Sequence, residues 1–234
     1  MRELAEQKPG WGCPIIHKVL RREGLVRNHK RAERIYREEK LSIRRRKRKK
    51  RAGHLRIEMP EPSRTNERWS MDFMSDQLWR SRRFRLFAIV DDYSRECLAL
   101  LADTSISGER VTRVLNVLAA TRGLPQYIRS DNGPEFTGQA LDEWAYRNKV
   151  KLDFITPGKP TQNAFIESFN STFRRECSTQ NWFVSLEEAR RLIESWRIEY
   201  NQVRPHSSLG GQTPAEFGRM NSQELNLAVV QKTG

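Results

Sequence analysis

The 234-residue sequence predicts a mixed α/β domain, a sheet covered by helices on both faces, preceded by a small basic helical module. Two observations support the sheet. From residue 67 onwards three strand-forming runs follow one another, and helical and strand patterns then alternate. A third observation separates the module, because the excess positive charge comes before this region. The length suffices for one good-sized core and a smaller module.

The location of the charge says more than its size. Residues 17–56 carry 18 Lys and Arg against 4 Asp and Glu, a balance of +14 that equals the net charge of the whole chain. Residues 1–16 carry 2 of each sign and residues 57–234 carry 23 of each. A localised positive field beside a neutral domain indicates that a polyanion docks at one end of the molecule.

Two short helices are expected within residues 12–40. Apolar side chains recur at helical spacing in both, Gly24 stops the first, and Asn28 is a plausible N-cap for the second. Lys30, Arg31 and Arg34 would face outward. A helix, a short turn with Gly and a basic helix form the layout of a helix-turn-helix, so these three cations are predicted DNA contacts. The alternative is a basic helical hairpin that only packs on the main domain.

Eight consecutive cations follow at residues 44–51, and repulsion between them disfavours an isolated element. Phosphates would order this arm and release counterions, which predicts DNA contacts. The predicted contacts are Arg44, Arg45, Arg46, Lys47 and Arg48. A solvated arm and a nuclear-import signal are the alternatives, and Pro60 and Pro62 then indicate an extended linker.

The sheet region is expected to hold a meander of three strands, followed by helices and strands in alternation. The expected strands are 68–75, 84–90, 96–102, 126–129 and 150–155, and the expected helices are 111–123, 134–144, 161–178 and 185–203. Pro134 suits the first position of its helix. A chain of this pattern has no run long and apolar enough to span a bilayer and no apolar signal core near its start, so a cytoplasmic protein is expected. The three cysteines, far apart and without metal-ligand spacing, are expected to be reduced and structural.

Three acidic residues stand in unusual settings. Asp72 lies inside its strand, Asp131 ends its own strand before an Asn-Gly turn, and Glu167 lies in the helix 161–178, with 35 residues between the last two. Three carboxylates from separate elements are what a pair of Mg²⁺ ions needs for phosphodiester chemistry. For Glu167 alone, a position on the solvated face of an amphipathic helix is the simpler explanation.

The helix around Glu167 has a polar face and an aromatic face. At 100° per residue, Asn163, Asn170 and Arg174 lie within 60° of Glu167, while three phenylalanines lie on the other side. These two amides and the arginine are predicted to touch DNA. Lys159, in the loop before the helix, is a predicted phosphate contact, with an ordinary polar loop as the alternative.

Several motifs in order carry a resemblance to a known family. They are Asp72, Ser130-Asp131-Asn132-Gly133, residues 163–170, residues 90–95, residues 200–209 and residues 213–217. Together these resemble the integrase core of retroviral integrases and bacterial insertion-sequence transposases, and the match to second-reading-frame (orfB-type) transposases is close. Residues 11–37 resemble the helical accessory domain of that family. The resemblance covers roughly residues 11–217.

The resemblance implies a ribonuclease-H-like fold with Asp72, Asp131 and Glu167 as catalytic metal ligands. It implies a DDE transposase, which cleaves DNA and transfers strands with two Mg²⁺ ions, with Mn²⁺ able to substitute. The expected domains are an accessory module (1–43), the arm and linker (44–66), the catalytic core (67–180) and a C-terminal helix with a tail (181–234). Arg204 and His206 would touch DNA near the site or merely close a helix end.

Two neighbouring acids, Asp91 and Asp92, are expected to be structural, either capping the strand turn or pairing with Arg95. The expected partners are element ends and target DNA, with self-association or an upstream-frame transposase subunit, and the expected location is the nucleoid. A hydrolytic nuclease of the same fold is one alternative function. The other is a DNA-binding regulatory or inactive fragment of a transposase that lacks its upstream domain.

Overall fold

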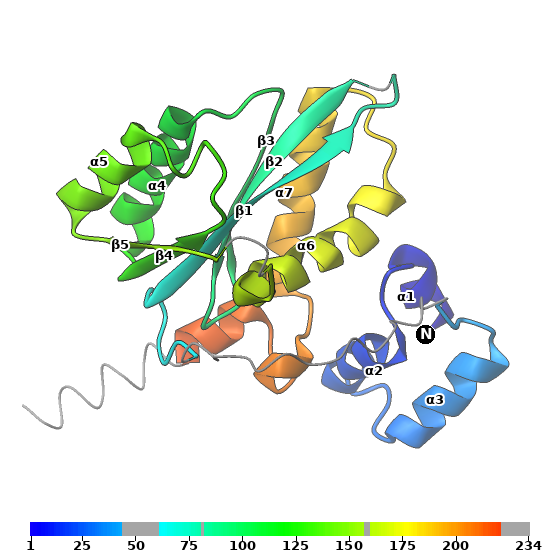
Figure 1. Ribbon diagram of the computed structural model, residues 1–234. Helices are drawn as coiled ribbons and strands as arrows, with labels where there is room; N and C mark the ends of the chain where they lie inside the picture. The colour runs from blue at the N-terminus through cyan, green and yellow to red at the C-terminus, as the bar shows by residue number, and fades with distance from the viewer. Residues whose placement is uncertain (44–60, 81, 157–159, 221–234) are drawn as a thin grey trace, which may run out of the picture.

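The computed structural model describes residues 1–43, 61–80, 82–156 and 160–220 and confirms the predicted five-stranded mixed sheet (Figure 1). The strand order is β3-β2-β1-β4-β5. The strands are β1 (Arg68–Gln77), β2 (Arg83–Asp91), β3 (Cys97–Asp103), β4 (Tyr127–Ser130) and β5 (Lys151–Phe154). The first three form the predicted antiparallel meander, and the last two join it as parallel strands on the other side of β1.

The central strand β1 is paired unequally on its two sides. It pairs with β2 over its whole length, whereas its parallel register with β4 ends at Ser70, opposite Arg129. β1 therefore continues past the end of β4. The sheet is open on that side from Met71 onwards, which is where the carboxyl ends of parallel strands offer room for a ligand.

Helices cover both faces of the sheet, as the sequence predicts. Helices α4 (Gly108–Arg122) and α5 (Gln139–Asn148) lie on one face, and α6 (Ala164–Glu176) and α7 (Leu186–Gln202) on the other (Figure 1). The alternation of β2 supplies both interfaces, because Phe87 and Ile89 join the α4–α5 cluster while Leu86 and Ala88 join the α6–α7 cluster. The sheet thus lies between two hydrophobic cores and contributes side chains to both.

The helix predicted to begin at Pro134 begins five residues later, at Gln139, after the N-cap Gly138. Tertiary contacts hold the intervening residues in a turn. The Phe136 side chain is fully buried and stacks on Phe73 with ring centroids 5.0 Å apart, and Glu135 pairs with Arg85. These contacts with the sheet outweigh the preference of Pro134 for a helix start.

The amino-terminal module has its own small core. Besides the two predicted helices, α2 (Cys13–Arg22) and α3 (His29–Glu38), it contains a six-residue helix, α1 (Arg2–Gln7), that the sequence pattern did not indicate. Asn28 caps α3 as predicted, accepting a 2.9 Å hydrogen bond from the Lys30 backbone N–H. Apolar side chains of all three helices meet in one cluster around Trp11.

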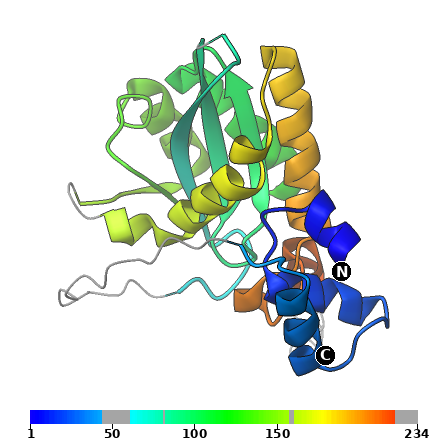
Figure 2. The ribbon, with the colours of Figure 1, turned by 90° about the vertical axis from the view of Figure 1, so that its right-hand side faces the viewer.

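The module packs against the main domain near the carboxyl end of α6 (Figure 2). The Trp11 Nε1 donates to Glu176 Oε2 at 3.3 Å, and Arg22 bonds both the Gly211 carbonyl at 3.0 Å and Glu216 at 2.6 Å. The hairpin therefore does pack on the main domain, yet the α3 cations point to solvent. DNA binding by this segment stays a prediction, and exposure leaves its cations available for it.

The acids of the β2–β3 turn are structural, as expected. Asp91 is fully buried and its Oδ1 accepts from the backbone N–H groups of Tyr93 and Ser94 at 3.0 and 2.8 Å. Asp92 pairs with Arg68, Nε to Oδ2 at 2.5 Å, whereas Arg95 bonds only its carbonyl. All three cysteines are free thiols, and none of the described helices is both long and apolar enough to cross a bilayer.

Candidate active site

Asp72 lies on β1 just beyond the point where β4 stops pairing with it. Its carboxylate is partly buried and accepts two hydrogen bonds, one from the Phe73 backbone N–H to Oδ1 at 2.8 Å and one from Asn170 Nδ2 to Oδ2 at 2.6 Å. Because strand residues alternate between faces, Asp72 points to the same side as Met74, towards α6. The open side of β1 therefore holds a carboxylate fixed by a neighbour in sequence and a helix.

Asp131 follows the last residue of β4 and begins the turn to α5. Its Oδ1 accepts from the Gly133 backbone N–H at 3.0 Å. A Cβ at position 133 would lie only 3.0 Å from that oxygen, so a residue other than glycine would crowd the carboxylate. Asn132 fixes the same turn to the end of β5 by donating to the Ile155 carbonyl at 2.8 Å.

Glu167 lies in the first turn of α6 and is exposed. The evidence that the three carboxylates are neighbours is electrostatic. The pKa of Asp72 is raised to about 6, chiefly by burial and in addition by the negative charges of Asp131 and Glu167, and its two hydrogen bonds lower it in part. Each of the other two acids is therefore close enough to disfavour the Asp72 charge.

The donor set suits a hard divalent cation, which prefers carboxylate oxygens. The side chains are not gathered into a finished metal site, however. No set of three His, Cys, Asp or Glu side chains in residues 1–43, 61–80, 82–156 and 160–220 converges closely enough to hold an ion. Simultaneous binding by all three acids would require a rotamer change, which is least costly for Glu167 because its side chain is exposed.

The start of α6 is held against the sheet by contacts on three sides. Asn163 Nδ2 donates to the Met71 carbonyl at 3.4 Å, on the open side of β1. The guanidinium of Arg95 stacks on the Phe165 ring at 3.6 Å from its centroid. Deeper in, Phe169 packs edge-on against Trp196 and Tyr200 of α7. These contacts set the position of the backbone that carries Glu167.

Four residues predicted to touch DNA are buried instead. Asn163 and Asn170 turn towards β1, where they bond the Met71 carbonyl and the Asp72 carboxylate. Arg204 is 8% exposed and pairs with Glu176 through Nε–Oε2 at 2.6 Å and NH2–Oε1 at 2.8 Å. His206 is also 8% exposed and packs edge-on against Tyr200. The alternative interpretation of Arg204 and His206, closure of a helix end, is the one that fits.

The buried His206 predicts a dependence of stability on pH. Burial, helped by the charge of Arg204, lowers the pKa of His206 to about 3. Unfolding restores a pKa near 6.5, so between pH 6.5 and pH 3 the unfolded chain binds the extra proton and stability falls as pH falls. From pH 7.5 to pH 5 this residue should remove about 2 kcal/mol of unfolding free energy.

Urea unfolding at pH 7.5 and pH 5 of the wild type and of His206→Asn checks this expectation. The variant lacks the titrating group, so its loss between the two pH values should be smaller by about 2 kcal/mol. An equal loss in both proteins would show that His206 does not carry the effect. Because only the difference between pH values is compared, any cost of the substitution itself cancels.

The other predicted DNA contacts divide into two groups. Lys30, Arg31, Arg34 and Arg174 are exposed, so each is available to a polyanion, although Arg34 lies 3.6 Å from Glu38. Arg44, Arg45, Arg46, Lys47, Arg48 and Lys159 lie outside the described residues. The roles of all ten in DNA binding remain predictions.

Arg129 was not singled out by sequence reasoning. This β4 residue is 5% exposed, bonds Asp153 on β5 through Nε at 2.8 Å, and donates from NH1 to the Gln162 carbonyl at 2.9 Å. It therefore ties the segment before α6 to the strand that carries Asp131. The signal in the sequence was a long charged side chain within a short strand. The sequence does not indicate that this side chain bonds the Gln162 carbonyl, 33 residues further on.

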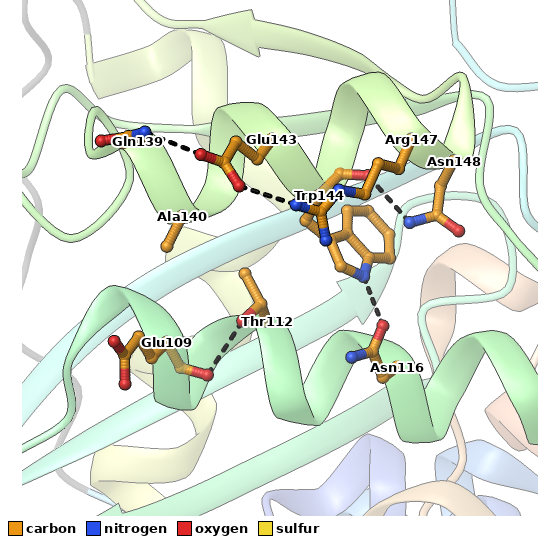
Figure 3. Close-up of a pocket in the computed structure, with 9 residues that line it drawn as sticks. All are labelled: Glu109, Thr112, Asn116, Gln139, Ala140, Glu143, Trp144, Arg147 and Asn148. Carbon is orange, nitrogen blue, oxygen red and sulfur yellow. Dashed lines mark hydrogen bonds and ion pairs between the residues drawn. The ribbon is translucent and has the colours of Figure 1, made fainter.

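One hollow of the described structure lies away from the carboxylates. It is a polar groove of about 540 Å³ between α4 and α5, where Trp144 donates to Asn116 Oδ1 at 2.7 Å (Figure 3). Glu109, Glu143 and Arg147 rim it (Figure 3). This groove is separate from the side of β1 that carries Asp72, where the pairing with β4 has ended.

Comparison with known proteins agrees with this geometry. Two models described as integrase core domain match residues 62–160 and 148–214. An uncharacterized 31.7 kDa protein of insertion element IS407 from Burkholderia multivorans is 46% identical over 92% of this chain and 78% of its own length. A 39.2 kDa protein of IS476 from Xanthomonas euvesicatoria is 43% identical over 99% of this chain and 67% of its own. The chain belongs to the insertion-sequence transposases with an integrase core.

Solved structures show the same fold at much lower identity. The catalytic core domain of HTLV-2 integrase, in a structure that contains magnesium, has a TM-score of 0.54 and 18% identity over 67% of this chain and 98% of its own. A chain in the structure of a simian T-cell lymphotropic virus intasome has a TM-score of 0.59 and 16% identity over 82% of this chain and 67% of its own. The ribonuclease-H-like fold expected for this integrase-core chain is confirmed.

Proposed function

We propose that this chain is a DDE transposase, a polynucleotidyl transferase that cleaves DNA strands and joins them to a target with Asp72, Asp131 and Glu167. The observation that carries the proposal is the effect of two of these carboxylates on the third. Asp131 and Glu167 each raise the pKa of Asp72, on the open side of β1. Like charges brought together at a protein surface are costly unless a cation is to be bound between them.

The proposed roles follow from what fixes each side chain. Asn170 and the Phe73 N–H orient the two oxygens of Asp72, and the Gly133 N–H orients Asp131. Glu167 is the adjustable third ligand because it is exposed on α6. Two Mg²⁺ ions, or Mn²⁺, held by these carboxylates would supply activation of the attacking oxygen and neutralisation of the departing one.

The residues of the chain do the positioning. An open edge lets a DNA strand lie across β1 with its phosphate beside Asp72 and Asp131. One site can serve two reactions, since water and a DNA 3′-hydroxyl are alternative nucleophiles for the same phosphate. First an element end is cut, and then that end is joined to target DNA. No covalent intermediate with the protein is proposed.

The DNA must be held mainly by positive charge outside the sheet domain. The 23 cations of residues 57–234 are balanced by 23 acids, so the sheet domain and tail carry no net charge. Residues 17–56, which include α3 and the arm at 44–51, supply the balance of +14 that attracts a polyanion. We also propose self-association or an upstream-frame subunit as partner, and action at the nucleoid.

A second candidate function is that of a DNA-binding regulatory or inactive fragment. The observation in its favour is that the described carboxylates do not converge into a three-ligand set. A third, a nuclease that cuts without joining, would use the same residues. The three candidates differ in whether the protein cleaves DNA and joins strands, cleaves only, or does neither.

One pair of assays separates them. Purified chain is incubated with supercoiled plasmid carrying a matching element end, with Mg²⁺, with Mn²⁺ or with EDTA, and separately with pre-cut ends and a target plasmid. A transposase is expected to nick the first and join the second, both only with metal. Cutting without joining would identify a nuclease. If neither reaction occurs while the DNA is bound, the chain is a regulatory fragment.

A further inference from the structure

An exposed aromatic and basic patch lies at the far end of β1 from the strand's beginning. The turn between β1 and β2 meets the loop that leads into α7 (Figure 1), and the Trp79 backbone N–H donates to the Phe183 carbonyl at 2.8 Å. On this junction the rings of Trp79 and Trp182 meet edge to face, with centroids 4.7 Å apart. They are 62% and 75% exposed, and Val184 beside them is 69% exposed.

Two exposed tryptophans in contact are unusual on a protein surface, where large apolar groups in clusters mark interaction sites. The other four tryptophans, at positions 11, 69, 144 and 196, are at most 8% exposed. Phe183, between Trp182 and Val184, is by contrast buried against Phe84. The loop therefore buries one aromatic ring and presents another.

Three arginines lie close to Trp79 in the sequence, and one acid, Glu188, accepts a 2.8 Å hydrogen bond from the Val184 backbone N–H. Arg80, Arg82 and Arg83 are exposed on the same turn, and no carboxylate of the described residues forms an ion pair with any of them. We propose that the patch of Trp79, Trp182, Val184 and the three arginines binds a DNA strand with unpaired bases, the rings stacking on bases and the guanidiniums contacting phosphates. The proposal deepens the proposed action on DNA and rests on it.

Charge decides between DNA and a second copy of the chain as the occupant. A symmetric dimer through this patch would bring six arginines together around four rings, and their repulsion would oppose the contact. A nucleic acid offers the opposite charge and a π-face at every base. The size also fits, because two rings with one valine give less apolar area than a stable protein interface needs.

The patch is placed to receive the same strand as the carboxylates. Trp79 is seven residues beyond Asp72 and two beyond the end of β1, so at about 3.3 Å per residue the two lie at most roughly 23 Å apart. Along the axis of duplex DNA, the phosphates of one strand repeat about every 3.4 Å. A strand that passes the carboxylates would reach the patch about six nucleotides away, where duplex DNA opened at a cut end would expose its bases.

The tryptophans give a direct assay. Because the other four are buried, quenching of fluorescence by acrylamide reports mainly Trp79 and Trp182. The full chain is titrated with a 12-nucleotide oligothymidylate and with a duplex of the same length, and the affinity is measured for three variants. These are Trp79→Ala/Trp182→Ala, Trp79→Phe/Trp182→Phe and Arg80→Gln/Arg82→Gln/Arg83→Gln. The control is Tyr146→Ala/Arg147→Gln, which removes an aromatic ring that is 88% exposed and a cation from α5.

Oligothymidylate is expected to protect the wild-type tryptophans from acrylamide. The double alanine variant should weaken its binding at least about fivefold, as loss of stacking on one base implies, and the phenylalanine variant should restore most of it. The arginine variant should lower the salt dependence of binding, and the control should change nothing. The duplex should be affected less than the single strand.

Unchanged affinity in the double alanine variant, or unprotected tryptophans at saturation, would overturn the proposal. So would a variant that alters only the sedimentation of the chain, because the patch would then be a contact between copies. DNA binding does not require catalysis, so this binding assay tests the patch even if the chain fails to cleave plasmid. Cleavage of a short duplex end by the double alanine variant reports on the carboxylate site separately.

Discussion

Asp72→Asn, Asp131→Asn and Glu167→Gln are each expected to lower DNA cleavage and strand transfer by at least about 10³-fold, because a lost metal ligand removes several kcal/mol of transition-state stabilisation. Binding of DNA should be equal or tighter, since each change removes a negative charge near a phosphate. Cleavage of supercoiled plasmid and a separate binding titration measure the two effects. Any variant that keeps its activity would remove that residue from the proposed site.

The folded state should tolerate these changes, and Asp72→Asn should even be neutral or stabilising without metal. The pKa of Asp72 is raised from 3.8 to about 6, so its charge at pH 7 costs about 3 kcal/mol relative to water. Asp76→Asn is the matched control, because Asp76 lies on the same strand and accepts from Ser178 Oγ at 2.6 Å. This control should retain cleavage.

Arg204→Ala is expected to destabilise the chain by about 3–5 kcal/mol, the usual cost of leaving one member of a buried ion pair alone. Glu176 would keep its charge under the end of α6 with only Trp11 and the partly exposed Arg175 as partners. Urea unfolding measures the loss. The exposed pair of Arg147 and Glu143 supplies the control, and Arg147→Ala should cost less than about 1 kcal/mol.

Removal of both charges distinguishes a paired contact from general packing. Glu176→Gln with Arg204→Met should recover much of the stability lost in Arg204→Ala, because no unpaired buried charge remains. If the double variant is as unstable as the single one, the cost comes from lost packing. If Arg204→Ala costs less than 1 kcal/mol, the pair is not buried in solution as described.

Local patterns predicted the elements well where local forces decide them. β2 is an apolar run bounded by polar residues, and it forms within one residue of the expected limits at each end. Ser185 caps α7 through a 3.1 Å bond from the Glu188 N–H, and the helix ends within one residue of its expected end. The start of α5 could not be predicted in this way, since the burial of Phe136 against β1 is a contact between distant residues.

The site was predicted only in part for the same reason. A helical wheel places Asn163 and Asn170 on the Glu167 side of α6, and this is consistent with their contacts. It does not show that β1 lies against that side, so the two amides seemed free for DNA. Arg204 and His206 follow the end of α7. No local sequence pattern indicates that Arg204 pairs with Glu176 or that His206 packs against Tyr200.

The order in which a ribosome releases these elements has a consequence for the growing chain. The face of β2 that carries Leu86 and Ala88 is covered by α6 and α7, and these helices are made long after the strand itself. Until Gln202 has emerged, this apolar face stays uncovered and the α6 backbone that carries Glu167 lacks its support from Trp196. Chains truncated during synthesis would therefore be prone to aggregation and inactive rather than partially active.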